Sequence, residues 1–403
     1  MKIILVDKLY YPYSGIQDYF IDLGRLLRLH GHQVISFDGY KRIDIKKYKL
    51  TLSSVMTKRS IWRVINALYS FNANYTFGKL LDEERPDVVH INNIHHIISP
   101  SFLYEAKKRN IPIVYSLHDY KLVCPIYRLY RDGHICKDCA HGKYIHVLKN
   151  HCPLHEQYNG MESLFLFIEA FLSKYIVRVS KLVDVFLTSS EYVKSVYKEM
   201  GFDGNMEVIP HFVFSSGNFG TNNKRKRKVG IYFGRLVPEK GLLILIKAAS
   251  FLDMDIHIIG MGLQQKYLET YCKSNNIKNI FFRGFLKKDM IKREIFQADV
   301  IILPSLWPEP FGKTIIEAFS MGKIVVASDV GGISEIISHG KNGFLVHPNN
   351  SQALKGILRK ISLMPDDLIQ KMNTQAYKTW KKKYNPDIYY KKLMHIYNSV
   401  KIT

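Results

Sequence analysis

Two glutamates, Glu309 and Glu317, are the side chains best placed to do chemistry in this sequence. Pro308 and Pro310 flank the first glutamate and disfavour helix there, so Glu309 should lie in a loop. A helix should then begin near Gly312, with Glu317 about one turn inside it. The first backbone N–H groups of a helix have no internal partner, and they favour a bound anion. Two carboxylates beside such a helix start could hold the polar groups of an anionic ligand.

Spacing alone does not separate a ligand site from an ordinary surface. Two acids eight residues apart are equally typical of an exposed loop followed by an exposed helix. The apolar, β-branched run at 299–304 favours a site, because it is typical of a buried parallel strand. Apolar residues between 315 and 321 then predict the helix. In open α/β sheets, ligands bind at the carboxyl ends of the strands, where this loop should lie.

The residues around Glu309 carry a family resemblance. The stretch Pro308-Glu309-Pro310-Phe311-Gly312 resembles the donor-sugar signature of retaining glycosyltransferases of family 4, which have the GT-B fold. The resemblance implies that Glu309 contacts the donor sugar and is catalytic, and that Glu317 holds the ribose of the nucleotide. It also implies donor-binding roles for Phe311, Gly312, Lys313 and Thr314.

Two cations follow the first predicted strand of the second half, 229–233. Arg235 and Lys240 lie in the glycine-bearing loop 234–241. Two fixed cations there suit a diphosphate, although an Arg or Lys in a loop is more commonly just solvated. The loop resembles the family's diphosphate-binding motif, which implies that both residues are catalytic and stabilise the departing diphosphate, with no metal needed for catalysis.

The resemblance also implies a site for the base of the nucleotide. Family members hold the base through backbone groups, and the matching residues here are Arg283, Gly284 and Phe285.

The first half opens as a βαβ unit of a parallel, doubly wound sheet. Residues 2–7 and 33–37 predict strands, and apolar residues at helical spacing from Ile16 onward predict the helix between them. The loop at Ser14 and Gly15 would let a phosphate approach closely, although an ordinary βα turn is the commoner use of such a loop. Family members usually have two adjacent glycines here, and the resemblance implies a donor contact at Gly15.

A histidine and an aspartate follow the predicted strand 113–117. His118 could contact substrate hydroxyls from the strand end, or it could be a loop histidine capped by Asp119. Family members carry a histidine after this strand that meets the donor sugar. The resemblance therefore implies a catalytic position for His118.

Four of the five cysteines fall within one short segment, at Cys124, Cys136, Cys139 and Cys152. Cys136 and Cys139 have the Cys-x-x-Cys spacing of a chelate, whereas the outer two lie farther away. Histidines are dense there as well, and His134 or His151 could replace a thiolate. Two uses fit this pattern equally: a structural zinc held by four thiolates, or reduced, unliganded cysteines in a loop.

The surplus of basic residues indicates an anionic partner. Lys and Arg number 58 against 35 Asp and Glu, which gives a formal net charge of +23. No nucleic-acid-binding motif is present, so phosphate-bearing substrates and an anionic membrane surface are favoured over nucleic acid. Basic residues at 41–63 are interleaved with aromatic residues up to Phe71. Such a stretch is equally typical of a solvated basic face and of a membrane-surface patch.

No segment of the sequence resembles a targeting or membrane-spanning segment. The apolar run after Lys2 ends at Asp7 and is too short for a signal peptide. The apolar run 164–168 is followed by Glu169 and Lys174, which interrupt it. We therefore expect a cytoplasmic protein, peripheral at the inner face of the cell membrane.

Length, pattern and resemblance together predict an α/β protein with the GT-B fold, in which two Rossmann-like domains with parallel sheets face each other. The expected acceptor domain is 1–214, including a Cys-rich insertion at 124–155. The expected nucleotide-sugar donor domain is 215–385, and a helix at 386–403 should cross back to the first domain. The polar, charged stretch 215–228 marks the boundary.

The resemblance implies a retaining hexosyltransferase that moves a sugar from a UDP- or GDP-sugar to a glycan or lipid-linked acceptor. The expected process is cell-envelope polysaccharide biosynthesis of the capsule or O-antigen type. Two other interpretations stay open: a sugar-nucleotide epimerase or other GT-B enzyme, and a basic scaffold that binds membranes or nucleic acid. Stabilisation by nucleotides would argue against the scaffold, and nucleotide release on adding acceptor would argue against the epimerase.

Overall fold

The protein is described from a computed structural model. The structure describes residues 1–8, 15–37, 42–43, 69–95, 98–152, 160–215 and 227–402. Contacts between residues divide the chain into two compact units. Unit 1 comprises Met1–Pro210 and Tyr389–Thr403, and unit 2 comprises His211–Ile388.

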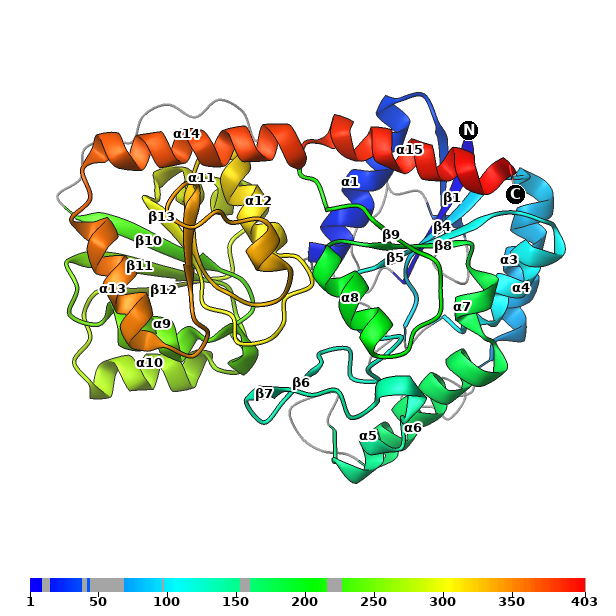
Figure 1. Cartoon of the computed structure of the whole chain (residues 1–403), viewed down its shortest axis with the longest axis horizontal. Coiled ribbons are helices and arrows are strands. Elements are labelled where there is room, and N and C mark those ends of the chain that lie inside the picture. The colour runs from blue at the N-terminus through cyan, green and yellow to red at the C-terminus, as the bar shows by residue number, and fades with distance from the viewer. Residues whose placement is uncertain are drawn as a thin grey trace. The chain divides into compact units, whose positions relative to one another are not determined.

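Unit 1 is built on a twisted, largely parallel sheet (Figure 1). Its described strands are β1 (Lys2–Asp7), β2 (Gln33–Phe37), β3 (Arg42–Ile43), β4 (Val88–Asn93), β5 (Ile113–Leu117), β8 (Val185–Thr188) and β9 (Met206–Val208). They run in the order β3-β2-β1-β4-β5-β8-β9, and each neighbouring pair is parallel except β2 with β3. Strands β4, β5 and β8 are buried along their whole length, as is usual for the inner strands of a parallel sheet.

Helices connect these strands and cover the sheet. The described helices of unit 1 before the last one are α1 (Gly15–Leu29), α3 (Phe71–Glu84), α4 (Leu103–Lys108), α5 (His146–Lys149), α6 (Gly160–Phe171), α7 (Val179–Leu182) and α8 (Glu191–Glu199). Short helical turns lie at Pro100–Phe102, Ala140–Gly142 and Leu172–Ile176. Ser190 caps α8, because its Oγ accepts the backbone N–H of Val193 at 3.2 Å. A small antiparallel hairpin, β6 (Tyr130–Arg131) and β7 (His134–Ile135), was not expected from the sequence.

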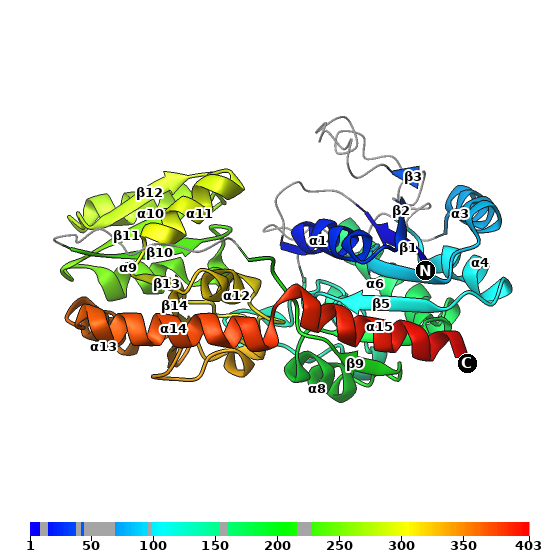
Figure 2. The same ribbon diagram turned by 90° about the horizontal axis from the view of Figure 1, so that it is seen from above.

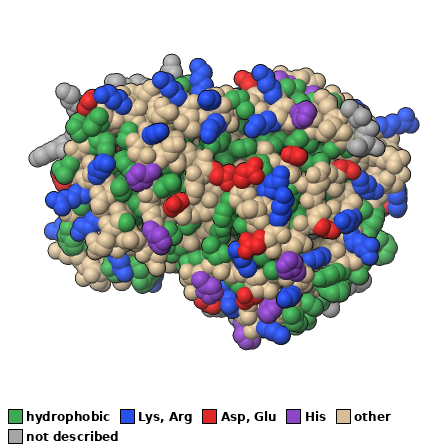
Figure 3. Space-filling model, in the orientation of Figure 1, with side chains coloured by type: hydrophobic (Ala, Val, Ile, Leu, Met, Phe, Trp, Pro, Cys, Tyr) green, Lys and Arg blue, Asp and Glu red, His purple; other side chains and the backbone are tan. Residues whose placement is uncertain are grey.

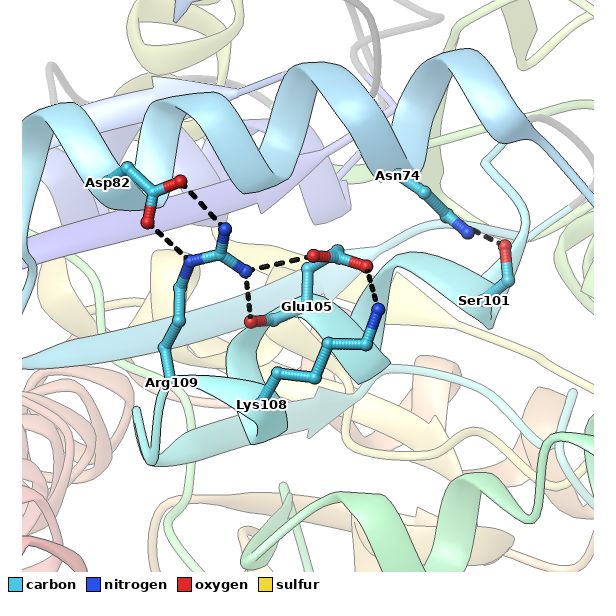
Figure 4. A network of polar contacts seen from close by, with 6 residues as sticks. All are labelled: Asn74, Asp82, Ser101, Glu105, Lys108 and Arg109. Carbon is cyan, nitrogen blue, oxygen red and sulfur yellow. Dashed lines mark hydrogen bonds and ion pairs between the residues drawn. The ribbon is translucent and has the colours of Figure 1, made fainter.

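A charged network fastens α3 to α4 on the surface of unit 1 (Figure 4). The Arg109 guanidinium donates to both carboxylate oxygens of Asp82 at 2.7 Å and to Glu105 Oε2 at 2.9 Å. Lys108 pairs with the other oxygen of Glu105 at 2.7 Å. This bidentate geometry fixes the two helices in register, although exposed ion pairs of this kind contribute only about 0–1 kcal/mol each.

The last helix, α15 (Pro386–Ile402), joins unit 1 from Tyr389 onward, far from the rest of that unit in sequence. Figure 2 shows it lying along the strands of this unit. Its Tyr397 hydroxyl meets His90 Nδ1 at 2.5 Å, and its Tyr389 hydroxyl is hydrogen-bonded to the Tyr19 hydroxyl. Both contacts are buried, so the end of the chain is part of the interior of unit 1.

Unit 2 contains a second parallel sheet. Its described strands are β10 (Lys228–Phe233), β11 (Met254–Ile259), β12 (Ile280–Gly284), β13 (Val300–Leu303), β14 (Ile324–Ser328) and β15 (Gly343–Val346), in the order β12-β11-β10-β13-β14-β15. Its described helices are α9 (Leu242–Ala249), α10 (Gln265–Ser274), α11 (Lys288–Gln297), α12 (Lys313–Ser320), α13 (Ser351–Ser362) and α14 (Asp366–Lys383), with short turns at Pro238–Lys240 and Gly331–Glu335. Strand β15 was not anticipated, whereas the predicted strands before it are present.

Helices cover both faces of the unit 2 sheet. One apolar core joins α9, α10 and α13 to the sheet, through residues such as Leu245, Leu268 and Leu358. A second core joins α11, α12 and α14 to the opposite face, through residues such as Ile295 and Ile316. A sheet buried on both faces leaves its strand ends as the places where polar groups can meet a ligand.

The burial of His90 predicts a pH dependence of stability. His90 Nε2 lies 2.8 Å from Ser116 Oγ, and burial lowers the pKa of this histidine to about 3. In the unfolded chain its pKa is about 6.5, so on acidification the unfolded state takes up the proton first. Neutral His90 therefore contributes fully above about pH 6.5, and its contribution is lost as the pH falls towards 3. Between pH 7 and pH 5 we expect a loss of about 2 kcal/mol from this group alone.

Urea unfolding of the whole chain at several pH values measures this effect. His90→Asn should lower stability at pH 7 but also remove about 2 kcal/mol of the pH dependence. His347, which is exposed in unit 2, provides the control, and His347→Asn should leave the pH dependence unchanged. An unaltered pH dependence in His90→Asn would show that His90 is not buried in its neutral form.

Candidate active site

The loops after successive strands of unit 2 are hydrogen-bonded to one another at the carboxyl edge of the sheet. Gly234 N–H donates to Ile259 O at 3.0 Å, and Gly260 N–H donates to Gly284 O at 2.8 Å. Leu306 N–H likewise reaches Glu239 O at 2.8 Å. The segments that follow β10, β11, β12 and β13 thus form one continuous rim, and this rim contains most of the residues predicted to bind the donor.

Two glycines allow the loop around Glu309 to approach its neighbours closely. Gly241 and Gly331 have φ values of 68° and 60°, in the left-handed region. A Cβ at Gly241 would lie 2.0 Å from Pro304 O, and one at Gly331 would lie 2.1 Å from Glu309 O. Either substitution would therefore strain the backbone and collide with the chain segment that carries Glu309.

Glu309 is the centre of this rim. Its side chain is buried, and Glu309 Oε1 accepts hydrogen bonds from the Lys240 ammonium and, at 2.7 Å, from Ser305 Oγ. Burial by itself would raise the pKa of Glu309, but the charge of Lys240 and these hydrogen bonds outweigh it and hold the pKa below its ordinary value. The Glu309 carboxylate is consequently ionised at neutral pH. It lies in the loop that precedes helix α12.

Lys240 is held by two neighbours. Besides the ion pair with Glu309, its ammonium lies 5.3 Å from the centre of the Trp307 ring, a cation–π contact. The other predicted cation, Arg235, has a 61 % exposed side chain and lies 3.9 Å from Glu239. The predicted diphosphate loop thus presents one fixed, neutralised cation and one cation that can reach a ligand from solvent.

Helix α12 begins where the sequence predicted, at Lys313 after Gly312. Gly312 caps it with φ 98°, a left-handed conformation. Lys313 pairs with Glu317 at 3.9 Å, one turn along the helix, and Thr314 between them is partly exposed. The side chains of Lys313 and Glu317 are both partly exposed to solvent near the start of the helix.

Phe311 and the segment at the end of β12 occupy different surroundings. Phe311 is buried between His211 and Tyr384, with ring centres 5.2 Å and 5.8 Å away, so its ring serves the core of unit 2. Arg283 lies 3.9 Å from Glu294, and Phe285 is half exposed. Gly284 between them has φ 64° and open space around it.

His118 of unit 1 is partly buried and ends a polar chain whose other members, Asn92 and Asp7, are buried. The Asn92 amide donates to Asp7, so its carbonyl oxygen accepts from His118 Nε2, and the Tyr19 ring stands edge-on 4.9 Å from the imidazole. This fixes the proton on Nε2 and leaves Nδ1 as the acceptor. Gly15 is the exposed first residue of α1, and the rest of its predicted phosphate loop, including Ser14, lies outside the described residues.

Family models assign the chain along nearly its whole length. Residues 13–214 match the model described as "Glycosyltransferase Family 4", and residues 217–379 match that described as "Glycosyl transferases group 1". The chain belongs to glycosyltransferase family 4. The resemblance seen around Glu309 is thereby confirmed.

Relatives of this family 4 glycosyltransferase support the assignment. The chain is 28 % identical over 358 residues to an uncharacterized 42.6 kDa protein in the cps region of Klebsiella pneumoniae, covering 83 % of this chain and 87 % of that protein. It is 25 % identical over 388 residues to an uncharacterized glycosyltransferase of Methanocaldococcus jannaschii, covering 95 % and 94 %.

Solved structures confirm the predicted GT-B fold of the glycosyltransferase. The structure of Anabaena HepE, solved in complex with UDP and glucose, matches 99 % of this chain and all of that chain, with a TM-score of 0.64 and 18 % identity. None of the described helices is long and apolar enough to cross a membrane.

Several residues of the site were not predicted from the sequence. Ser305, whose hydroxyl donates to the Glu309 carboxylate, directly follows a predicted strand. That position at a strand end is the sequence feature from which Ser305 could have been predicted as a site residue. Asn92 and Asp7, which orient His118, also stand at strand ends, but nothing in the sequence pairs them. Only the register of parallel strands β1 and β4 brings these two side chains together.

The Lys240–Glu309 pair predicts a specific pattern of stability in this glycosyltransferase. Lys240→Met should lower the free energy of unfolding by about 3 kcal/mol, because it leaves a buried carboxylate without its counter-charge. Adding Glu309→Gln to that variant should restore most of the loss, because the buried charge is then removed as well. Urea unfolding of both variants and of Glu309→Gln alone completes the cycle. A double variant no more stable than Lys240→Met would contradict the pairing.

Proposed function

We propose that this glycosyltransferase moves a sugar from a UDP- or GDP-sugar to a glycan or lipid-linked acceptor, with retention at the anomeric carbon. The buried Lys240–Glu309 pair at the strand ends of unit 2 is the observation that carries the proposal. It sets a cation for a phosphate and a carboxylate for sugar hydroxyls side by side. The likeness to HepE, solved with UDP and glucose, supports this donor class.

The proposed process is cell-envelope polysaccharide biosynthesis of the capsule or O-antigen type. The relative encoded in a cps region of Klebsiella pneumoniae, matched over most of both chains, supports it. Unit 2, with the Glu309 rim, is proposed as the donor-binding domain, and unit 1 as the acceptor-binding domain with His118 at the sugar.

The donor would change the partners of the resting pair. A donor phosphate oxygen can replace Glu309 as the partner of Lys240, which releases the carboxylate to accept hydrogen bonds from sugar hydroxyls. Arg235, whose side chain is exposed at the rim, can reach the same diphosphate. The N-terminal end of α12 adds favourable electrostatics for an anion. Glu317 at the far side of that turn is suited to the two ribose hydroxyls.

In the transfer step, the bond between the anomeric carbon and the diphosphate oxygen breaks, and its electron pair stays with the diphosphate. The acceptor hydroxyl oxygen forms the new bond on the same face of the sugar, and its proton passes to the departing phosphate oxygen. Lys240 and Arg235 stabilise the negative charge that develops there. Glu309 orients the sugar in this proposal. His118 accepts a hydrogen bond from a sugar hydroxyl in this proposal, while its Nε2 stays bonded to Asn92.

Substitution of the two glutamates tests the function. Glu309→Gln should lower kcat by at least about 100-fold, since an interaction made with the reacting sugar is lost. Glu317→Gln should mainly raise the KM for the donor, because it removes a ribose contact far from the reacting bond. Release of nucleoside diphosphate is measured with UDP- and GDP-sugars and extracted lipid-linked acceptors. Release only when acceptor is present separates transfer from epimerisation.

Nucleotide binding provides the control for these kinetics. Arg235→Ala should weaken binding of the nucleoside diphosphate by about 1.5–3 kcal/mol and that of the monophosphate by much less, because a charge-assisted contact is lost. Arg359→Ala, on the surface of α13, should change neither. Equal losses for both nucleotides, or normal turnover of both glutamate variants, would place the site elsewhere.

We further propose that the enzyme works at the cytoplasmic face of the membrane, bound to anionic lipid. The chain carries a formal net charge of +23, and Phe71 and Tyr75 at the start of α3 are 79 % and 74 % exposed. The basic stretch before them, including Lys46, Lys47 and Arg63, lies outside the described residues. Basic side chains beside exposed aromatic rings suit an anionic interface.

Vesicle sedimentation measures this association. Binding to phosphatidylglycerol vesicles should weaken as salt rises, and it should be reduced by reversing the charges of Lys46, Lys47 and Arg63 to Glu. Reversal of three exposed lysines on α14, Lys378, Lys381 and Lys382, serves as the matched control. Equal loss in both triple variants would show that net charge, and not this stretch, attracts the protein to lipid.

A further inference from the structure

Four cysteines that are spread over the segment 124–152 meet around one small cavity in unit 1. Cys124, Cys136, Cys139 and Cys152 all line it, and its volume is about 10 Å³, room for a single water-sized particle. The fifth cysteine, Cys272, lies in the core of unit 2. The four thiols are therefore gathered by the fold and not only by their places in the sequence. This cavity has no part in the proposed transfer chemistry.

The backbone around the thiols is arranged as it is around metal-bound sulfur. The backbone N–H groups of Ile126 and Leu129 are directed at the Cys124 sulfur. Cys136 directly follows the β6–β7 hairpin, and its own N–H donates to Leu129 O at 3.0 Å. The two N–H groups directed at the Cys124 sulfur would stabilise negative charge on its thiolate, and the Cys136 N–H holds the end of the hairpin in place.

The segment has little regular structure to hold it together. Its strands are two residues long and its helix α5 has four residues. Five of its non-glycine residues have a left-handed backbone conformation: Tyr127, Leu129, Asp132, His141 and His151. Each such residue is strained, and short, loop-rich segments of this kind are usually held by a disulfide or a metal. The cysteines are all free thiols, which favours the metal.

The cavity lies between this segment and its neighbours in unit 1. Its wall includes Met200, at the end of α8, and Met200 O accepts the His141 N–H at 2.7 Å. Ser163 Oγ on α6 donates to Cys152 O at 3.0 Å. An ion in the cavity would thus stabilise the segment 124–152 close to its contacts with α6 and with the end of α8. Figure 3 shows histidine side chains gathered on the surface of this part of unit 1.

We propose that Cys124, Cys136, Cys139 and Cys152 bind one structural Zn²⁺ ion as thiolates. Tetrahedral coordination by four cysteines is the standard arrangement of structural zinc, and each thiol releases its proton to water as it binds. The described residues that line the cavity include no histidine, so His134 and His151 are not needed as ligands. Arg131, which also lines the cavity, offsets part of the negative charge of a zinc tetrathiolate.

Zinc binding includes a closing movement of the thiols. Among the described residues, no three His, Cys, Asp or Glu side chains are already arranged around one ion position. A cysteine sulfur moves by rotation about a single torsion between staggered positions, without a change in the backbone. The proposal therefore includes rotamer changes by which the four cysteines that line this cavity close on the ion.

Metal analysis of the full chain, purified without a histidine tag and reconstituted with zinc before dialysis, tests the proposal. The protein should retain about one zinc ion per chain. The variant Cys136→Ser/Cys139→Ser should retain less than about a tenth of that amount. Cys272→Ser is the matched control and should retain the full amount. Less than half an equivalent in the wild type, or undiminished zinc in the double variant, would overturn the assignment.

A second measurement on the wild-type chain covers the case in which the double variant fails to fold. X-ray absorption at the zinc edge should show four sulfur ligands at about 2.3 Å and no nitrogen. Replacement by Co²⁺ should give the intense visible bands of a tetrahedral thiolate site. Nitrogen ligands, octahedral cobalt, or disulfides found by thiol titration of the denatured, unreduced chain would each refute a four-thiolate site.

Discussion

The ion pair between Lys240 and Glu309 is the interaction on which the donor side of this glycosyltransferase depends. A buried carboxylate needs a counter-charge and hydrogen-bond donors, and the chain supplies them from two loops 69 residues apart in sequence. Two left-handed glycines, Gly241 and Gly331, let the surrounding segments come close enough to do so. The Lys240 ammonium stabilises the loop when no donor is bound, and in the proposed function it also binds the diphosphate. Stability and ligand binding therefore depend on the same groups.

A comparable constraint acts in unit 1, but it is built from neutral groups. His90, Ser116, Tyr19 and the two α15 tyrosines form a buried network in which each hydroxyl or ring nitrogen has a partner. A neighbouring series of hydrogen bonds runs from His118 to Asn92 and from Asn92 to Asp7. The Tyr19 ring packs against His118. Helix α15 therefore completes the interior that surrounds His118. A change in its docking would reach this imidazole through Tyr19.

The sequence allowed most of the regular elements to be predicted, because long apolar runs and helical spacing are local signals. The short elements were missed: β15 and the β6–β7 hairpin have four residues or fewer, and such stretches carry too few side chains to show a period. Phe311 shows another limit. Its place in the signature implies a donor contact, which stays a prediction, while the ring itself packs between His211 and Tyr384, a contact that no local pattern indicates.

By itself, the sequence determined the family, the alternation of strands and helices, and the loops that carry Glu309, Lys240, Arg235 and His118, since each of these is written in contiguous residues. Only the tertiary structure decided which of them meet. It joined Lys240 to Glu309, joined Asn92 and Asp7 to His118, and gathered four cysteines around one cavity. Those contacts depend on strand register and on turns with left-handed residues, which are set by packing across the whole sheet and have no signature in a short stretch of chain.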